Sequence, residues 1–168
     1  GQRQPGDPMH RVTLAALLLL SGCVGGQRET TAFRAPEAPI WSAAAFVPAQ
    51  VTGEWQQVAA FTAKPGGCRG GAVSVDPAPG GYAVKGTLCL DGTARKVDAL
   101  ARPVGPGRLS VEGQEDWWVL WVDSGYRTVA VGTPSGQVGF VLDRGRISQD
   151  RLVAAAEIFA FNGYVSGR

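Results

Sequence analysis

The sequence predicts an all-β fold, an eight-stranded antiparallel up-and-down barrel with a C-terminal α-helix packed on its outside. From Val51 to Arg144, apolar stretches alternate with seven clusters of turn-forming residues, which divides this segment into eight strands. The turns are short, which favours a meander whose closure leaves no open edge. Residues 148–161 then show apolar side chains at helical spacing.

The seven turn clusters are rich in Gly, Pro, Asp and Ser, which suit turn backbones. They are Lys64–Gly67, Pro77–Gly80, Asp91–Gly92, Pro103–Gly107, Gly113–Glu115, Ser124–Gly125 and Thr133–Gly136. Because each strand reverses direction, the eighth strand ends at the same end of the barrel where the first begins. Arg144 is therefore expected beside Trp55, where it can make a cation–π contact.

The motif Gly53-Glu54-Trp55, the eight strands and the closing Leu142-Asp143-Arg144 together resemble the lipocalin family. In that family the Trp plugs the closed end of the barrel and the Arg lies across its ring, which implies structural roles for Gly53, Trp55 and Arg144. The segment Glu115–Arg127 looks like a third family block, often written Thr-Asp-Tyr, but departs from it at two of three positions. The resemblance covers roughly residues 46–165, and its spacing favours the bacterial outer-membrane lipoprotein type. Another small β-barrel or a β-sandwich is the alternative.

The N-terminal sequence predicts export and lipid attachment. Arg11 precedes a largely apolar run, Val12–Leu20, which is too short to span a bilayer but suits a signal peptide. Leu20-Ser21-Gly22-Cys23 resembles the bacterial lipobox, in which the cysteine is acylated and becomes the new N-terminus. Val24 in place of Asp then predicts an outer-membrane location facing the periplasm. An ordinary secretory signal with an incidental cysteine is the alternative.

These features divide the chain into three parts: the upstream residues and signal peptide (1–22), a lipidated N-terminus and linker (23–47), and the barrel with its helix (48–168). The linker is rich in Ala, Pro and polar residues and would hold the barrel about 25–30 Å from the membrane. The net charge of the 168-residue chain is +2. Removing residues 1–22 takes away two arginines and one aspartate and leaves +1, so nothing indicates nucleic-acid binding.

The two remaining cysteines are expected to form a disulfide. If the turn after Pro77 is centred between Ala78 and Pro79, Val73 faces Val84 and Cys68 faces Cys89, at a Cα separation that suits a disulfide. In an exported protein this bond would form and contribute about 3 kcal/mol. The same register directs both cysteines outward and Tyr82, Val84, Leu88 and Leu90 inward. A reactive free cysteine is the alternative.

The Trp-rich hairpin has two apolar faces. A two-residue turn at Ser124–Gly125 pairs Trp121 with Thr128 and Val119 with Ala130. We assign Trp117, Val119 and Trp121 to the interior, which leaves the other face, made of Trp118, Leu120, Val122, Val129 and Val131, for the helix to cover. The helical stripe expected to do so consists of Leu152, Ala155, Ala156 and Phe159, with Ser148 as N-cap and Asn162-Gly163 as the stop.

An apolar interior with aromatic walls would suit an acyl chain or another small lipophile. The positions predicted to face inward are Phe61, Val73, Val75, Tyr82, Val84, Leu88, Val97, Ala99, Leu109, Val111, Trp117 and Trp121. Arg69 shares this parity near the mouth, where it could meet a carboxylate or phosphate. The alternatives are that these side chains fill a solid core and that Arg69 is a solvated loop residue.

The residue inventory disfavours catalysis, because the only histidine, His10, lies in the signal segment. No cofactor or metal is expected. The sequence therefore predicts a lipid-anchored lipocalin that binds or transports a fatty acid or lysophospholipid in the cell envelope. A structural or interaction lipoprotein with a filled barrel is the second hypothesis, and an enzyme with a cysteine nucleophile is the third. The ligand, a homodimer and the completeness of the C-terminus are left open.

Overall fold

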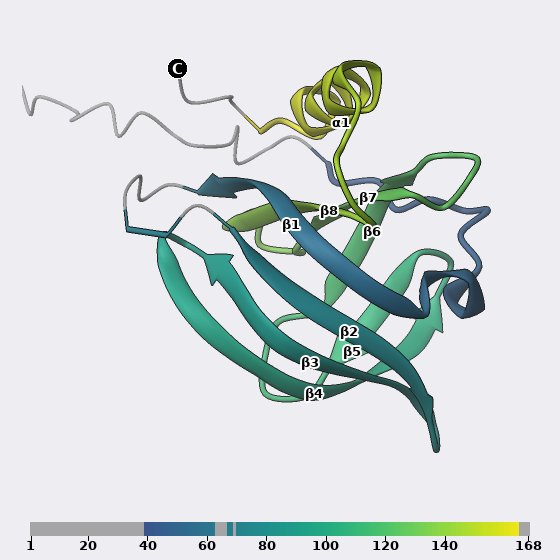
Figure 1. Ribbon diagram of the computed structural model, residues 1–168. Helices are drawn as coiled ribbons and strands as arrows, with labels where there is room; N and C mark the ends of the chain where they lie inside the picture. The colour runs from purple at the N-terminus through teal and green to yellow at the C-terminus, as the bar shows by residue number, and fades with distance from the viewer. Residues whose placement is uncertain (1–38, 63–66, 69, 165–168) are drawn as a thin grey trace, which may run out of the picture.

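Eight antiparallel strands close into a barrel in which each strand pairs with the next and the last pairs with the first (Figure 1). The computed structural model describes residues 39–62, 67–68 and 70–164. The strands are β1 (Gly53–Thr62), β2 (Gly71–Ala78), β3 (Gly81–Leu90), β4 (Thr93–Gly105), β5 (Arg108–Val111), β6 (Trp117–Val122), β7 (Thr128–Gly132) and β8 (Val138–Asp143). The predicted fold class and strand number are confirmed.

The closed end of the barrel is built around Trp55 and Arg144, as the resemblance implied. The Arg144 guanidinium lies 4.1 Å from the centroid of the Trp55 ring. The same side chain donates hydrogen bonds to the carbonyls of Gln50, Thr52 and Tyr126. It thereby ties the short 3₁₀ helix η1 (Pro48–Val51) and the loop between β6 and β7 to the start of β1.

Glycine at the start of this motif has a steric cause. Gly53 has a φ of 114°, and a Cβ there would lie 2.9 Å from Nη1 of Arg144. Any other residue would therefore meet both backbone strain and a clash with the side chain that closes the barrel.

The helix α1 (Gln149–Phe161) packs on the outside of the barrel, as predicted. Ser148 caps it by accepting a hydrogen bond from the Arg151 amide, and Gly163 follows it with a φ of 82°. Its buried residues are Ala155 and Phe159, whereas Ala156 is exposed, so the predicted stripe is wrong at that position. Among the described residues, no helix is long and apolar enough to cross a membrane.

Side-chain contacts at both of its ends hold α1 against the barrel. The ring of Phe159 stacks on that of Phe61 in β1 with centroids 4.1 Å apart. At the other end of the helix, Nη2 of Arg151 lies 3.3 Å from Oδ1 of Asp143, which is buried and also accepts a hydrogen bond from Thr128. The helix thus runs from the closed end of the barrel, where β8 finishes, toward the mouth, where β1 finishes.

The segment before η1 belongs to the folded unit and not to the linker. Ala43 donates a backbone hydrogen bond to Val119, and Phe46 is buried in the barrel core. The backbone amide of Trp41 donates to Oδ1 of Asn162 at the end of α1. The predicted boundary at residue 48 is therefore too late, because this stretch packs by isolated contacts that show no periodicity in the sequence.

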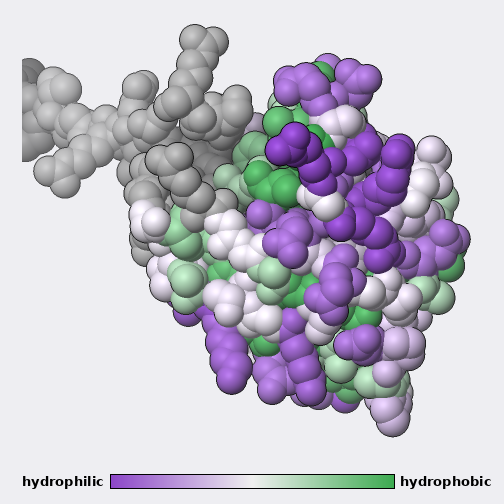
Figure 2. All heavy atoms as spheres, in the orientation of Figure 1, coloured by the Kyte–Doolittle hydropathy of each residue, from purple (hydrophilic) through white to green (hydrophobic). Residues whose placement is uncertain are grey.

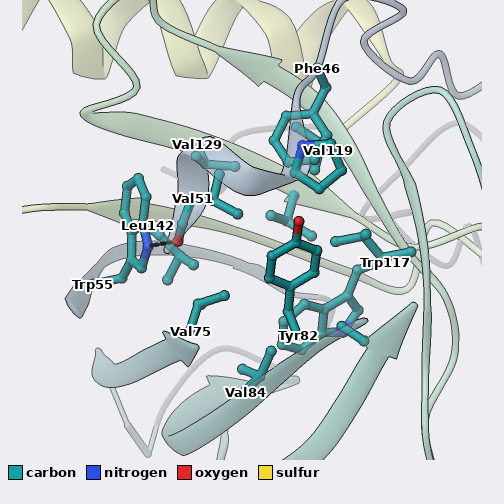
Figure 3. A pocket seen from close by; sticks show the side chains of 14 residues that line it. Phe46, Val51, Trp55, Val75, Tyr82, Val84, Trp117, Val119, Val129 and Leu142 are labelled. Atoms are coloured by element: carbon teal, nitrogen blue, oxygen red, sulfur yellow. Dashed lines mark hydrogen bonds between the residues drawn. The ribbon is translucent and has the colours of Figure 1, made fainter. Parts of the chain in front are cut away.

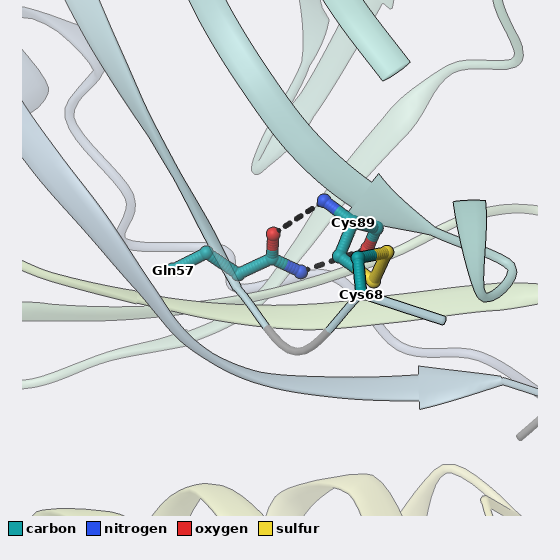
Figure 4. The surroundings of a disulfide bond; sticks show 3 residues. All are labelled: Gln57, Cys68 and Cys89. Atoms are coloured by element: carbon teal, nitrogen blue, oxygen red, sulfur yellow. Dashed lines mark hydrogen bonds between the residues drawn. A yellow bond between two sulfur atoms is a disulfide. The ribbon is translucent and has the colours of Figure 1, made fainter. Parts of the chain in front are cut away.

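The disulfide between Cys68 and Cys89 is present, with a Cα separation of 5.6 Å (Figure 4). The register that predicted it is wrong by two residues, because the turn is centred between Pro79 and Gly80 and Val75, not Val73, pairs with Val84. A shift of two keeps every side chain on its predicted face. Tyr82, Val84, Leu88 and Leu90 therefore still contact the inner core.

Gln57 and the disulfide close a gap beside the mouth, where β2 does not reach the end of β3. The last paired residue on β3 toward the mouth is Thr87, so Cys89 has no partner in β2. The buried Gln57 side chain takes that place. Its Oε1 accepts from the Cys89 amide at 2.7 Å and its Nε2 donates to the Cys89 carbonyl at 2.8 Å (Figure 4).

Replacing Gln57 with leucine is expected to lower the free energy of unfolding by about 2–4 kcal/mol, because two buried backbone groups of Cys89 lose their partners. Urea denaturation with the disulfide intact measures this loss. The control is Gln56→Leu on the exposed neighbour, with an expected change within about 0.5 kcal/mol. Equal losses in the two variants would show that the side-chain bridge contributes nothing specific.

Candidate ligand-binding site

The barrel interior contains a small apolar cavity near the closed end, with a volume of about 50 Å³. Phe46, Trp55 and Tyr82 point into the same space (Figure 3). The lining residues are Phe46, Pro48, Val51, Trp55, Val75, Tyr82, Val84, Ala101, Leu109, Trp117, Val119, Val129, Val131 and Leu142. A cavity of this size holds a few water molecules, whereas pockets for drug-sized ligands measure about 300–1,000 Å³.

The cavity is small because large side chains fill the half of the barrel nearer the mouth. Leu88, Val97 and Phe140 are at most 1% exposed. Trp117 packs edge-on against Phe140, with ring centroids 5.2 Å apart. This part of the barrel is therefore a packed core.

A second, open pocket of about 640 Å³ lies at the mouth, opposite Trp55 and Arg144. It is formed by the ends of β3, β4 and β8 and by the loops that follow β5 and β7. Its lining residues are Leu90, Asp91, Thr93, Ala94, Arg95, Lys96, Gly113, Gln114, Glu115, Trp117, Thr133 and Val138. Apolar side chains on the barrel side and charged side chains on the rim make this pocket amphipathic.

Trp117 separates the two spaces, because it lines both the interior cavity and the mouth pocket. Its indole Nε1 lies 3.3 Å from Oε1 of Gln114, in the loop that borders the mouth. The ring is only 5% exposed, because it also packs among the other side chains of the inner core. Trp117 therefore forms part of the wall between the interior cavity and the mouth pocket.

Arg95 is a basic residue at the mouth. In the alternation of β4 it falls on the same face as the inward-facing residue Val97. It pairs directly with Leu88 and lies two residues before the buried Val97. Within the described part of the chain, no ion pair holds its guanidinium. A carboxylate or phosphate in the mouth pocket could therefore bind it through two parallel hydrogen bonds.

Most of the predicted ligand-binding residues do face the interior. These are Val73, Tyr82, Val84, Leu88, Val97, Leu109, Val111 and Trp117, and the further inward positions Val75 and Ala99 join them. Of the predicted ligand-binding residues, Tyr82, Val84, Leu109 and Trp117 line the cavity. The others are buried between neighbouring side chains, so their part in ligand binding stays a prediction.

Phe61 and Trp121 lie outside the barrel, and the prediction that they face inward is wrong. Both pack in the cluster beneath α1. The register shifts between Gln57 and Ala59 in β1 and between Val119 and Trp121 in β6. Each bulge places two successive residues on the outer face and reverses the alternation beyond it. Both irregularities occur on strands that α1 covers.

The loop between β6 and β7 is longer than the predicted two-residue turn. Because the bulge in β6 reverses the alternation after Val119, Val122 faces inward with its partner Val129, and Val131 also contacts the inner core and not the helix. Asp123 organises this loop by accepting hydrogen bonds from the backbone amides of Arg127 and Thr128. Burial alone would raise the pKa of Asp123, but hydrogen bonds from Thr128, Arg127 and Gly125 outweigh it and hold the pKa below its usual value. This carboxylate stabilises the conformation of the loop and lies far from the mouth.

Two groups of pocket residues escaped sequence reasoning. Phe46, Pro48 and Val51 close the interior cavity from a segment with no strand or helix pattern. Arg95 could have been found, because it continues the inward series of Val97, Ala99 and Ala101 toward the mouth. Arg69, the basic residue proposed for this position, lies outside the described residues, as does Cys23.

Comparisons with known proteins gave distant structural similarities only. No protein-family model matches the sequence, and no curated protein matches it. Among solved structures, lobster apocrustacyanin A1 is 14% identical with a TM-score of 0.48, over 74% of this chain and 83% of the other. Apocrustacyanin C2 is 15% identical with a TM-score of 0.48, over 67% of this chain and 71% of the other. A function for this chain therefore has to be inferred from its own geometry.

Proposed function

We propose that this protein is a lipid-anchored, lipocalin-type barrel that binds a small anionic amphiphile, a fatty acid or a lysophospholipid, at its mouth. The proposal rests mainly on the mouth pocket of about 640 Å³. In this pocket Leu90, Trp117 and Val138 provide apolar surface, and Arg95 provides a positive charge. The contact between Trp55 and Arg144 supports the kinship with lipocalins.

The geometry suggests how such a ligand would lie. Its head group would pair with Arg95 on the rim, and the first part of its acyl chain would lie against Trp117. The interior cavity of about 50 Å³ cannot take a long chain as it stands. Deeper entry would require Trp117 and the core side chains packed around it to move. A short chain or a partly exposed one fits without this change.

The remaining parts of the proposal come from the sequence. Acylation of Cys23 would anchor the protein in the outer membrane, with the barrel facing the periplasm. Two or three acyl chains hold a protein stably, because each buried CH₂ contributes about 0.8 kcal/mol. The anchor would keep the barrel near the lipids from which it takes its ligand.

Titration of the chain from residue 24 onward with palmitate and with lysophosphatidylglycerol tests the binding proposal, and organic extraction with mass spectrometry identifies any lipid retained from cells. Saturable change in tryptophan fluorescence is expected. Arg95→Gln should weaken binding about tenfold or more, because an anionic head group loses a charged partner. The charge-matched control is Lys85→Gln, an exposed position on the outer face of β3 that lines neither the cavity nor the mouth pocket.

The second candidate is an interaction lipoprotein with a filled barrel, and the packed interior favours it. Leu88 and Phe140 have no exposed surface, and the residual cavity is small. A flat fluorescence titration, no extracted lipid and an Arg95→Gln variant that behaves like the parent would together reject ligand binding and leave this candidate standing.

A further inference from the structure

Two aromatic side chains are exposed at one corner of the molecule, the end of α1 nearest the mouth. Trp41 is 60% exposed and Phe161 is 72% exposed. The backbone amide of Trp41 donates to Oδ1 of Asn162 at 2.7 Å, which fixes Trp41 next to the residue that follows Phe161. The two exposed aromatic residues thus lie on neighbouring stretches of the chain, and exposed apolar side chains close to one another can form an interaction surface.

The outer face of α1 extends this apolar corner. Val153 is 45% exposed, and Ala156 and Ala160 lie exposed on the same side of the helix. The last turn carries no basic residue, and Glu157 is acidic. Figure 2 shows hydrophobic surface between α1 and the barrel, whereas hydrophilic residues cover much of the visible side of α1 and many positions on the lower strands. The partner of this corner is therefore recognised by apolar contact, not by charge.

The corner also lies where the described chain begins. In Figure 1 the start of that chain and the yellow end of α1 lie on the same side of the barrel. Pro39 follows Cys23 by 16 positions, and a fully extended chain over that span reaches at most about 55 Å. If Cys23 is acylated, the bilayer is always within reach of this corner.

We propose that Trp41 and Phe161 insert into the surface of the lipid bilayer and turn the mouth of the barrel toward it. Tryptophan and phenylalanine are the side chains that proteins use at membrane interfaces. The orientation follows from Tyr164, three residues after Phe161, whose hydroxyl donates to the carbonyl of Val138. Val138 lines the mouth pocket, so a bilayer that contacts this corner lies beside the mouth.

This proposal rests on the proposed lipid anchor for its proximity argument, and it deepens the proposed function. An amphiphile could pass between bilayer and mouth without crossing water. Docking by apolar contact alone is expected on neutral lipid, so vesicles of phosphatidylcholine are the appropriate probe.

The test uses the protein as cells process it, purified from membranes and reconstituted in phosphatidylcholine vesicles with brominated acyl chains, which quench nearby tryptophans. Quenching is expected for the parent and should fall in both Trp41→Ser and Phe161→Ser. Phe161→Ser keeps every tryptophan, so its loss of quenching reports undocking, expected as an about tenfold shift of the docking equilibrium. The control is Val104→Ser, which removes a 57% exposed apolar side chain near the closed end.

Parent-like quenching in Phe161→Ser, or an equal loss in Val104→Ser, would overturn the proposal. A dimer in detergent-free buffer that Phe161→Ser dissociates, with quenching unchanged, would also overturn it and assign the corner to a second copy. The mass of the mature N-terminus tests the anchor separately. If Cys23 is unmodified and quenching still depends on Trp41 and Phe161, the anchor is wrong and the docking surface stands.

Discussion

Replacing Phe159 with alanine is expected to lower the free energy of unfolding by about 3–5 kcal/mol, the usual cost of removing a large buried aromatic. Phe159 has no exposed surface and contacts both Phe61 and Tyr164, with ring centroids 4.1 and 5.0 Å apart. A Cβ on Gly139 would lie 2.5 Å from its ring, which shows how closely the helix approaches β8. The cavity left by alanine could not collapse without moving α1.

Urea denaturation measures this loss, and the matched control lies two residues away on the same helix. Phe161 is 72% exposed, so Phe161→Ala should change the free energy of unfolding by no more than about 0.5 kcal/mol. Loosening of α1 in Phe159→Ala should also expose Trp118 and Trp121 and shift the tryptophan emission to longer wavelength. Similar small losses in both variants would mean that the helix adds little to the stability of the barrel.

Replacing Trp55 with alanine should cost a similar amount, about 3–5 kcal/mol, for a different reason. Trp55 is 1% exposed and closes the barrel at the end opposite the mouth. Its indole Nε1 donates to the Val51 carbonyl at 2.8 Å, and Arg144 lies over its ring. The substitution therefore removes core packing, a tie to η1 and a cation–π contact together.

The free energies of unfolding of Trp55→Ala and Trp41→Ala should be measured together. The comparison separates the closing role of Trp55 from any general effect of removing an indole. Trp41 is 60% exposed, and it is its backbone amide, not its side chain, that donates to Asn162, so its side chain should contribute little to folding. Arg144→Ala should produce a smaller loss than Trp55→Ala, because that side chain is exposed. A Trp55→Ala variant as stable as Trp41→Ala would contradict the closing role of this residue.

The packing of the interior side chains bears on both function hypotheses, the amphiphile carrier and the interaction protein with a filled barrel. The mouth pocket can take an amphiphile in the structure as it stands, whereas the cavity cannot take a long acyl chain. Trp117 borders both spaces and is packed against Phe140 between them. A carrier with a shallow site and an interaction protein with a solid core would thus differ mainly at Arg95 and Trp117.

The order of the strands, the disulfide and the meeting of Trp55 with Arg144 could all be predicted from the sequence. These features depend on local patterns, namely turn residues, alternation over a few positions and the reversal of direction at each turn. Even a register wrong by two residues between β2 and β3 left Tyr82 and Val84 on the correct face, because the side-chain period in a strand is two.

Only the tertiary structure decided which way Phe61 and Trp121 point and how much space the barrel keeps. The bulges that turn these two residues outward lie on strands that pack against α1, which follows β1 by about ninety residues in the chain. Phe46 closes the cavity from a segment whose conformation comes from contacts and not from periodicity. Cavity volume depends on how all of these side chains fit together, and no local stretch of sequence contains that information.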